Sequence, residues 1–591
     1  MTEPLLFPLP RSVHRLDTGR RHDHPLVEAH DPTLPPQGFT LSVDDDHALL
    51  RYADDAGRRY GRQTLTQLRD DAGRLPTVEV ADHPDMTVRG FMLDVSRDRV
   101  PTRETLDRLV TVLEACRYNH LQLYVEHTFA YRDHRDVWRD ASPLDAEDLR
   151  WLRDRCGGAG IELAANQNCF GHFGRWLAHD TYRQRAECPD GFDFLPGIRL
   201  PAGVLAPTAD NAAFALSLVR EQVAAFGARI VNVDCDETFE LGRGASRDLV
   251  ARDGLGTVYA EHLGRIIAPL VADGLEVQFW GDVVAHHPEV LPRLPTDATT
   301  ALVWNYDAPD AAKIELPEPL RRPLAEIGID TTADTRFDGR LAPFVDSAVR
   351  HWVAPGTSTW NSIVGRIDNA RGNLLDAASA GRASGAEGFL VTDWGDGGHH
   401  QPLTVSYPPI AYGGAVAWGA EANADLDVTA AIDRYLLDDT AGVLGGVLDR
   451  IGRVARRTGV DAVNASPLLA GLVPDTLTLQ RGDPDPDRML EVIATLDGAR
   501  DDLARARPSG PQSGAIVEEL AVAIGLTRVA AETMGRRCGL PSRATEERVA
   551  ELDGLIDRYR AAWLTTSRPG GLDDSAAHLV AASGSLGADG T

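Results

Sequence analysis

The sequence predicts an α/β fold: a (β/α)8 TIM barrel with a small N-terminal α/β domain before it and a C-terminal α-helical domain after it. From residue 87 to residue 420, eight short apolar segments alternate with helical patterns, as a parallel α/β architecture requires. Beyond this region the chain is rich in Ala, Leu and Arg, with apolar residues at helical spacing. Because 591 residues are too many for a single core, we expect separate domains.

The N-terminal domain is expected to span residues 1–86. Residues 38–43 and 47–52 are predicted strands on either side of an Asp-rich turn. Residues 60–68 are a predicted helix, and residues 77–80 a returning strand. This pattern is typical of a small, non-catalytic α/β domain.

The barrel is expected to span residues 87–420. Its predicted strands are residues 90–95, 120–125, 161–165, 230–234, 276–280, 300–304, 351–353 and 388–392. The clearest helical patterns between them are residues 103–116, 146–156, 211–225 and 258–272. The helix at 146–156 is expected to end at Gly157-Gly158.

The helical domain is expected to span residues 421–580. Residues 489–506, 514–538 and 544–563 are predicted helices, with a short helix after the turn at Arg568-Pro569-Gly570-Gly571. Residues 581–591 are expected to form a disordered tail. This domain either packs on the barrel or joins two copies of the chain in a homo-oligomer, and the sequence does not separate these alternatives.

Composition limits the partners and the compartment. With 60 basic and 88 acidic residues the formal charge is −28, which disfavours nucleic acid and anionic membranes as partners. We expect no signal peptide and no membrane-spanning segment. The six cysteines lie far apart without CxxC spacing, which indicates free thiols and a cytoplasmic location.

Residues 230–238 contain the most informative pattern. A β-branched apolar run, which is typical of a buried parallel strand, leads into the adjacent acids Asp236 and Glu237. In barrel enzymes the carboxyl ends of the strands carry the chemistry. Two adjacent carboxylates repel each other, so surroundings that keep one of them protonated can make it a general acid. The alternative is an acidic loop that caps the next helix.

Aromatic residues gather at the other predicted strand ends. Trp280 and Trp304 each end a strand, Tyr306 follows the sixth strand, Trp360 the seventh and Trp394 the eighth. Indole faces that stack on sugar C–H faces, beside carboxylates that bind hydroxyls, are what a sugar pocket requires. For each Trp alone, core packing is the competing interpretation.

These motifs, in this order, resemble glycoside hydrolase family 20, the β-N-acetylhexosaminidases. Residues 57–68 with Leu75-Pro76 resemble the end of that family's non-catalytic domain, and residues 89–97 resemble its first barrel strand. Asp236-Glu237 is similar to the family's catalytic pair, and Trp394-Gly395-Asp396 to its late Trp-x-acid motif. The Cys-Asp-Glu-Thr sequence around the pair suggests a bacterial branch of the family.

The resemblance implies an exo-acting, retaining enzyme that removes terminal β-linked GlcNAc or GalNAc from a small glycoside or oligosaccharide. In this family the 2-acetamido oxygen of the substrate attacks C1 and forms an oxazolinium intermediate. Glu237 would be the general acid and then the general base, and Asp236 would orient the acetamido group. Asp234 is a candidate buried partner of Asp236. No organic cofactor or metal is implied.

The resemblance also implies substrate-binding residues. Arg89 and Asp396 match residues that bind hydroxyls of the terminal sugar, His172 matches a histidine near the acidic pair, and Glu126 an acid that supports it. Arg89 precedes its strand, so the alternative for it is an ion pair at the bottom of the barrel. For a lone His such as His172, a structural role is the alternative.

One part of the family pattern is missing. The family places a Tyr after strand seven to hydrogen-bond the acetamido carbonyl oxygen, whereas this chain has Thr359-Trp360-Asn361-Ser362. Tyr306 and Asn361 are both candidates to replace it. Adjacent His399-His400 lacks metal-ligand spacing and is expected to lie in a solvated rim loop.

Two other functions remain open from the sequence. One is a retaining glycosidase on another sugar, with an enzyme carboxylate as the nucleophile. The other is a non-catalytic sugar-binding protein on the same scaffold, against which the retention of both acids argues.

Overall fold

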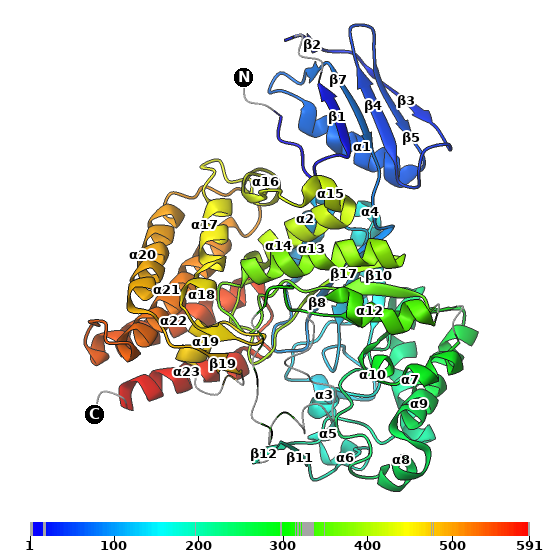
Figure 1. The fold of residues 1–591 in the computed structure, drawn as a ribbon, viewed down its shortest axis with the longest axis vertical. Helices are drawn as coiled ribbons and strands as arrows, with labels where there is room; N and C mark the ends of the chain where they lie inside the picture. Colours follow the sequence, from blue (N-terminus) through cyan, green and yellow to red (C-terminus); the bar gives the residue numbers. More distant parts are fainter. Residues whose placement is uncertain are drawn as a thin grey trace.

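The computed structural model describes the chain except residues 1–3, 16–18, 196, 296–297, 312, 314, 316–317, 319–320, 322–335, 348, 474–475, 477 and 589–591. Figure 1 shows three regions: a sheet domain at the top, a barrel below it, and a layer of helices along one side of the barrel. No described helix is long and apolar enough to cross a membrane.

The N-terminal domain is a five-stranded sheet with one helix. The strand order is β1-β7-β4-β5-β3, and only β3 and β5 pair in parallel. The elements are β1 (Ser12–Arg15), β3 (Leu26–His30), β4 (Phe39–Val43), β5 (Ala48–Tyr52), β7 (Val78–Asp82) and α1 (Asp55–Leu68), with β2 (Arg21–His22) and β6 (Leu75–Pro76) paired beside them. The sequence predicted β4, β5, β7 and α1. It missed the edge strands β1 and β3, which are too exposed to show apolar alternation.

Eight parallel strands close the barrel, in the order β10-β13-β14-β15-β16-β17-β8-β9. They are β8 (Val88–Asp94), β9 (His120–Tyr124), β10 (Glu162–Asn166), β13 (Ile230–Asn232), β14 (Glu276–Trp280), β15 (Thr299–Trp304), β16 (His351–Ala354) and β17 (Gly388–Asp393). The predicted fold class is confirmed. Two strands are shorter than predicted: β9 ends at Tyr124, one residue early, and β13 ends at Asn232. Beyond Asn232 the residues Asp234, Cys235 and Glu237 have positive φ, which does not fit a regular strand.

Helices surround the barrel. The long ones are α2 (Arg103–Ala115), α4 (Ala146–Ala159), α7 (Ala209–Phe226), α9 (Leu255–Ala272), α12 (Phe337–Asp346), α13 (Ile367–Ser384) and α14 (Tyr407–Trp418). Helix α4 continues through Gly157-Gly158, so the predicted stop is wrong. A Gly inside a helix costs only about 1 kcal/mol, so Gly157 and Gly158 do not stop the helix. It ends instead at Gly160, which has a left-handed backbone with φ of 72°.

The short elements at the lower end of Figure 1 extend the loops that follow the barrel strands. They are α3 (Arg135–Trp138), α5 (Gly174–Leu177), α6 (Asp180–Arg183), β11 (Phe192–Leu195), β12 (Ile198–Leu200), α8 (Arg247–Asp253) and α10 (Asp282–His286). Strand β8 starts beside the sheet domain and runs away from it. The sheet domain therefore adjoins the amino ends of the strands, and the opposite end is open to loops.

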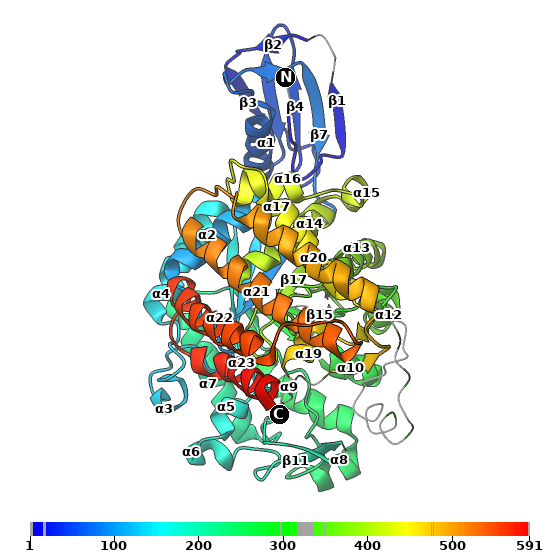
Figure 2. The same ribbon diagram turned by 90° about the vertical axis from the view of Figure 1, so that its left-hand side faces the viewer.

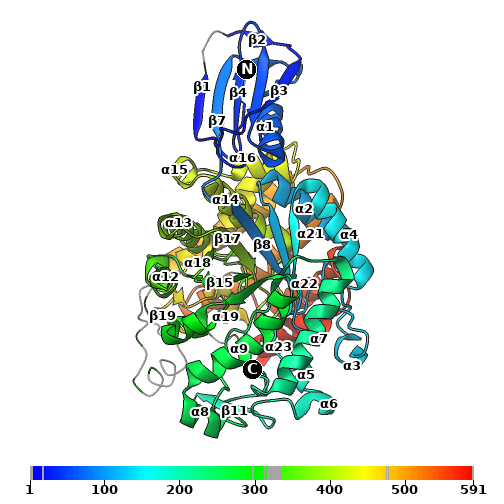
Figure 3. The same cartoon turned by 90° about the vertical axis from the view of Figure 1, so that its right-hand side faces the viewer.

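The C-terminal region is helical and lies against the barrel (Figures 2 and 3). Its main helices are α17 (Leu444–Gly452), α19 (Pro467–Leu472), α20 (Pro486–Leu503), α21 (Ser513–Arg537), α22 (Thr545–Thr566) and α23 (Leu572–Ala588). Helix α23 buries Leu579, Ala582 and Leu586, so the disordered tail expected from residue 581 is wrong up to Ala588. Residues 589–591 lie outside the described part of the chain.

The helical region shares one hydrophobic core with the barrel helices. Leu113 of α2, Ile410 of α14 and Leu520 of α21 all belong to it. Buried polar contacts cross the same boundary: Arg99 pairs with Glu519 at 2.5 Å, and Tyr559 Oη donates to the carbonyl oxygen of His399 at 2.9 Å. Of the two alternatives for this region, the structure shows packing on the barrel.

Candidate active site

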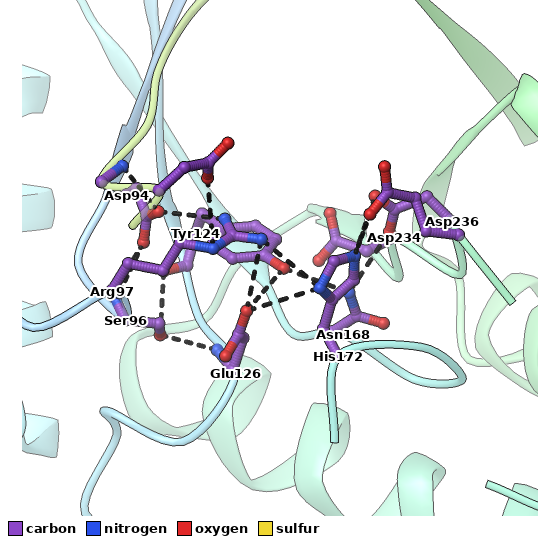
Figure 4. A network of polar contacts seen from close by, with 12 residues as sticks. Asp94, Ser96, Arg97, Tyr124, Glu126, Asn168, His172, Asp234 and Asp236 are labelled. Carbon is purple, nitrogen blue, oxygen red and sulfur yellow. Dashed lines mark hydrogen bonds and ion pairs between the residues drawn. The ribbon is translucent and has the colours of Figure 1, made fainter. Parts of the chain in front are cut away.

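The loops after five neighbouring strands meet at the carboxyl end of the barrel. They bring Arg97 (after β8), Glu126 (after β9), His172 (after β10), Asp236 (after β13) and Asp396 (after β17) into one network. Figure 4 shows the Arg97 and Glu126 side chains on one side of the His172 ring and Asp236 on the other. Five loops that are distant in sequence thus surround a single set of ionisable groups.

The acid pair lies on a tight loop with a left-handed backbone. The φ angles are 54° at Asp234, 68° at Cys235 and 49° at Glu237. Gly171, in the loop after β10, packs directly against this loop. A Cβ at Gly171 would lie 2.3 Å from the carbonyl oxygen of Asp236, so only Gly allows the two loops to approach this closely. Asp and Glu rarely adopt positive φ without support, and such conformations concentrate at functional sites.

Asp236 is held in its ionised form. The amide of Asn168 donates to Asp236 Oδ1 at 3.3 Å, and His172 Nε2 lies 3.3 Å from Asp236 Oδ2. Burial opposes ionisation, but the neighbouring His172 outweighs it and holds the pKa of Asp236 below its usual value. Only 12% of the side chain is exposed. Asp236 is therefore a fixed negative charge.

His172 is the cation between the acids. Its Nδ1 lies 3.7 Å from Glu126 Oε1, and its Nε2 lies 3.6 Å from Glu237 Oε2. Burial lowers the proton affinity of the ring, but Asp236 and Glu237 together raise the pKa of His172 to about 10. The residue itself has a positive φ of 55°. His172 is thus an imidazolium at neutral pH.

Glu237 differs from Asp236 in its exposure and in the direction of its pKa shift. Its side chain is 40% exposed, and its partial withdrawal from water, helped by the charge of Asp236, raises its pKa above the usual value. The backbone N–H of Glu237 donates to Asp282 Oδ2 at 3.2 Å. Glu237 is therefore an accessible carboxyl group that retains its proton to higher pH than an ordinary Glu.

Two further acids lie beneath the pair. Asp234 Oδ1 accepts from Trp280 Nε1 at 2.7 Å, and burial raises the pKa of Asp234 well above its usual value. Burial and the charge of Asp236 raise the pKa of Asp282 to about 7. Asp234 was expected as a partner of Asp236; Asp282 was not expected, although its position directly after Trp280-Gly281 at a strand end was the available signal.

Arg97 lies in this network, although the sequence interpretation gave it no role in substrate binding. Its guanidinium pairs with Asp94 at 3.0 Å, Asp396 at 3.4 Å and Glu126 at 3.6 Å. It also lies over the rings of Tyr124 and Trp394, at 5.0 Å and 5.1 Å from their centroids. The signal was its place after the carboxyl end of β8, where an arginine can face the site.

Arg89, which the resemblance implied as a sugar ligand, lies elsewhere. It is the second residue of β8, at the amino end of the barrel, and is fully buried against the N-terminal domain. Its guanidinium donates to the carbonyl oxygens of Arg117 and Met86 and to Tyr60 Oη at 2.7–2.8 Å. The expectation is wrong, because a residue at the start of a barrel strand lies at the end opposite the carboxyl-end loops.

The aromatic residues form a continuous cluster beside the acids. Tyr306 stacks on Trp304 at 5.2 Å and meets Trp360 edge-on at 5.0 Å, and Trp280 lies 6.1 Å from Trp394. Trp304 and Tyr306 are partly exposed, whereas Trp280 and Trp360 are buried. The first two can therefore contact a ligand directly, and the buried two support them.

The described part of the chain contains no group of three His, Cys, Asp or Glu side chains arranged to hold a metal ion. His399 and His400 are buried, so the expected solvated rim loop is wrong: the loop packs under α23, where Ser575 Oγ accepts from the N–H of His399 at 2.9 Å. The six cysteines are free thiols.

Comparison with known proteins identifies the N-terminal domain. Residues 12–83 match the model described as glycosyl hydrolase family 20, domain 2. A β-hexosaminidase of Akkermansia muciniphila is 32% identical over 111 residues, which are 18% of this chain and 22% of that protein. The match thus spans about a fifth of that relative's length.

Solved structures share the fold of the whole chain. The chitobiase of Flavobacterium johnsoniae has a TM-score of 0.55 and 13% identity, over 97% of this chain and 99% of that one. An exo β-N-acetylglucosaminidase of Vibrio harveyi, in complex with N-acetylglucosamine, has a TM-score of 0.52 and 14% identity over 70% and 73% of the two chains. Residues 12–83 are therefore similar to domain 2 of glycosyl hydrolase family 20, and the chain as a whole has the fold of these solved enzymes.

Proposed function

We propose that the chain is an exo-acting β-N-acetylhexosaminidase that hydrolyses terminal β-linked GlcNAc or GalNAc with retention, by a substrate-assisted mechanism. One observation carries the proposal: two adjacent acids at the mouth of the barrel differ in pKa and in access. Asp236 is enclosed and its pKa lies below the usual value, whereas Glu237 is 40% exposed and its pKa lies above the usual value. The family 20 domain and the names of the similar proteins support this choice of reaction.

Glu237 is the one acid of the pair that can reach a glycosidic oxygen. In the first step the acetamido carbonyl oxygen bonds to C1, the bond from C1 to the leaving oxygen breaks, and Glu237 gives that oxygen its proton. In the second step water attacks C1, Glu237 takes a proton from the water, and the acetamido group re-forms. The substrate supplies the nucleophile, so one acid–base carboxyl is sufficient.

Asp236 and the aromatic cluster would address the acetamido group. An ionised Asp236 accepts a hydrogen bond from the acetamido N–H and stabilises the positive charge that develops on it. Arg97 and Asp396, which pair at 3.4 Å at the rim, would bind hydroxyls at the far side of the sugar ring. Tyr306 can donate its phenolic proton to the carbonyl oxygen, because a phenol is protonated at neutral pH and burial raises its pKa further. The Asn361 amide already donates to the carbonyl oxygen of Asn464 at 3.3 Å, which favours Tyr306.

Replacement of Glu237 by Gln tests the central assignment. Glu237→Gln keeps the shape of the side chain but cannot transfer a proton, so we expect kcat on an aryl β-GlcNAc to fall by about 10²–10⁴-fold. The panel of substrates is aryl β-GlcNAc, β-GalNAc, β-glucoside and β-galactoside. Glu276→Gln is the matched control, because Glu276 is an exposed residue at the amino end of β14. Undiminished hydrolysis by Glu237→Gln would show that another group moves the proton.

The origin of the nucleophile is a separate test. A thiazoline mimic of the bicyclic intermediate should inhibit the wild type, and substrates without the acetamido group should not turn over. Tyr306→Phe removes one donor to the acetamido oxygen and should lower kcat on aryl β-GlcNAc by about 100-fold. Capture of a covalent glycosyl-enzyme with a fluorosugar would instead establish an enzyme carboxylate as the nucleophile, and an inactive wild type would leave a sugar-binding protein.

A further inference from the structure

We propose that Asn464, in the C-terminal helical region, is a positioning residue for the aromatic wall of the sugar pocket. The inference rests on the proposed function and adds a role for a region outside the barrel. Asn464 lies between β18 (Asp461–Ala462) and α19, about one hundred residues after the loop that it contacts. Through it the helical region becomes part of the active site.

Asn464 joins the loop that follows β16 by three hydrogen bonds. Its Oδ1 accepts from Trp360 Nε1 at 3.0 Å and from the Arg366 guanidinium at 3.3 Å. Its carbonyl oxygen accepts from the Asn361 amide at 3.3 Å. The backbone N–H of Ser466 adds a fourth link, to the carbonyl oxygen of Asn361 at 2.8 Å. Side chain and backbone thus hold two consecutive residues of the barrel loop.

The first of these residues, Trp360, transmits the position to the pocket. It is fully buried, so its indole N–H has to be satisfied inside the protein, and Asn464 satisfies it. Its ring meets Tyr306 at 80° and 5.0 Å. Both rings press on Gly356, where a Cβ would lie 2.3 Å from Trp360 Cη2 and 2.9 Å from Tyr306 Cδ1. Contact with Trp360 and with Gly356 therefore limits where the Tyr306 ring can lie.

The second residue, Asn361, lies beside the rim acid. Its Oδ1 is 2.9 Å from the Cβ position of Gly397, which directly follows Asp396. Asn361 and Asn464 both have a left-handed backbone, with φ of 48° and 49°. Conformations of this kind persist when surrounding contacts hold them. Without the side chain of Asn464, the segment around it would keep its backbone bonds to Asn361 but lose the bond that fixes Trp360 relative to the acids.

The left-handed backbone allows a clean set of variants. Asn464→Gly retains a residue that adopts positive φ easily and removes the acceptor from Trp360, whereas Asn464→Asp retains the acceptor. Trp360→Phe removes the donor from the other side of the same bond. Asp461→Asn is the matched control, because it breaks only the exposed ion pair of Asp461 with Arg481 in the same segment.

The measurement is kcat and KM on an aryl β-GlcNAc, with the melting temperature of each variant. Asn464→Gly leaves the buried indole N–H of Trp360 without an acceptor, so the aromatic wall should be held less firmly where the substrate binds. We therefore expect this variant to raise KM about tenfold. Asn464→Asp and Asp461→Asn should have KM values close to that of the wild type. In the Trp360→Phe background the same Gly substitution should have a much smaller effect, since the bond to Trp360 is already absent and only the bond to Arg366 is left to remove.

Two results would overturn the proposal while the wild type is active: a wild-type KM in Asn464→Gly, or an effect of that substitution that is undiminished in Trp360→Phe. If Asn464→Gly does not fold, Trp360→Phe alone must show the raised KM, and a wild-type value there also overturns it. An inactive wild type would count against the proposed function. The positioning role would then be judged by whether Asn464→Gly weakens binding of N-acetylglucosamine in calorimetry.

Discussion

At the scale of single residues, His172 controls the ionisation of the site. It lies between Asp236, at 3.3 Å, and Glu126, at 3.7 Å, and it contacts the Glu237 carboxyl at 3.6 Å. Its positive charge lowers the pKa of Asp236, whereas burial and the charge of Asp236 raise the pKa of Glu237 against the effect of the same cation. The pKa values of the adjacent carboxyl groups are therefore shifted in opposite directions, which suits the two groups to different tasks.

The pH dependence follows from these directions. Activity requires Asp236 ionised and Glu237 protonated, so it should rise with pH through a depressed Asp236 pKa and fall through a raised Glu237 pKa. His172→Asn removes the cation that depresses the pKa of Asp236. We expect the acid limb of the kcat/KM profile to move to higher pH by one unit or more, about the effect of an adjacent opposite charge.

The control for this profile is His47→Asn, at a turn of the N-terminal domain where the side chain is 43% exposed. It should leave both limbs in place. An acid limb that stays unchanged in His172→Asn would mean that other groups set the ionisation of Asp236.

At the scale of elements, the loops after β10 and β13 fit together closely. Gly171, one residue before His172, lies against the carbonyl oxygen of Asp236, where a Cβ would approach to 2.3 Å. Backbone contact at this distance fixes both loops and sets the spacing between the imidazolium and the acids. The left-handed residues in the loop after β13 direct the side chains of Asp236 and Glu237 toward the imidazolium of His172.

Substitution of Gly171 tests this fit. Gly171→Ala should push the two loops apart, and because a shift of about 1 Å in a catalytic group can cost about 10²-fold, we expect a loss of that order in kcat. Gly174→Ala is the control in the same segment, since the nearest atom to its Cβ would be 3.8 Å away. Equal activity of the two variants would show that the loops yield without moving the site.

The sequence predicted the elements better than their ends. All eight barrel strands were found from apolar runs, because a parallel barrel buries its strands on both faces. The end of β13 was missed, since positive φ at three non-glycine residues comes from tertiary contacts that no local pattern carries. The same limit applies to β1 and β3, whose exposed edges lack alternation.

At the scale of the whole molecule, buried charge joins the helical region to the barrel. Arg99, after β8, is buried with Glu519 of α21 and also donates to the Gln401 carbonyl oxygen at 3.0 Å and to Ser567 Oγ at 2.9 Å. Its guanidinium lies 4.7 Å from the Trp563 ring centroid. The two regions therefore share polar as well as apolar contacts, and we expect them to unfold together.

Loss of this arginine should be costly. Arg99→Ala leaves Glu519 buried without its cation, which typically destabilises a protein by about 3–5 kcal/mol. Arg558→Ala is the matched control on the same helices: it breaks an exposed pair with Glu518, 48% and 45% exposed, worth about 0–1 kcal/mol. Chemical denaturation of both variants measures the difference. Similar midpoints, or a separate transition for the helical region in the wild type, would contradict a shared core.

By itself the sequence determined the barrel, the flanking domains, the acid pair at a strand end and the aromatic residues around it. These features depend on local patterns of burial and on chain order, which a sequence records directly. Only the tertiary structure decided which arginine faces the acids: Arg97 lies in the site and Arg89 at the opposite end of the barrel. It also placed Asn464 against Trp360, from a segment about one hundred residues away. Such contacts depend on how loops and domains pack in space, and no pattern along the chain specifies them.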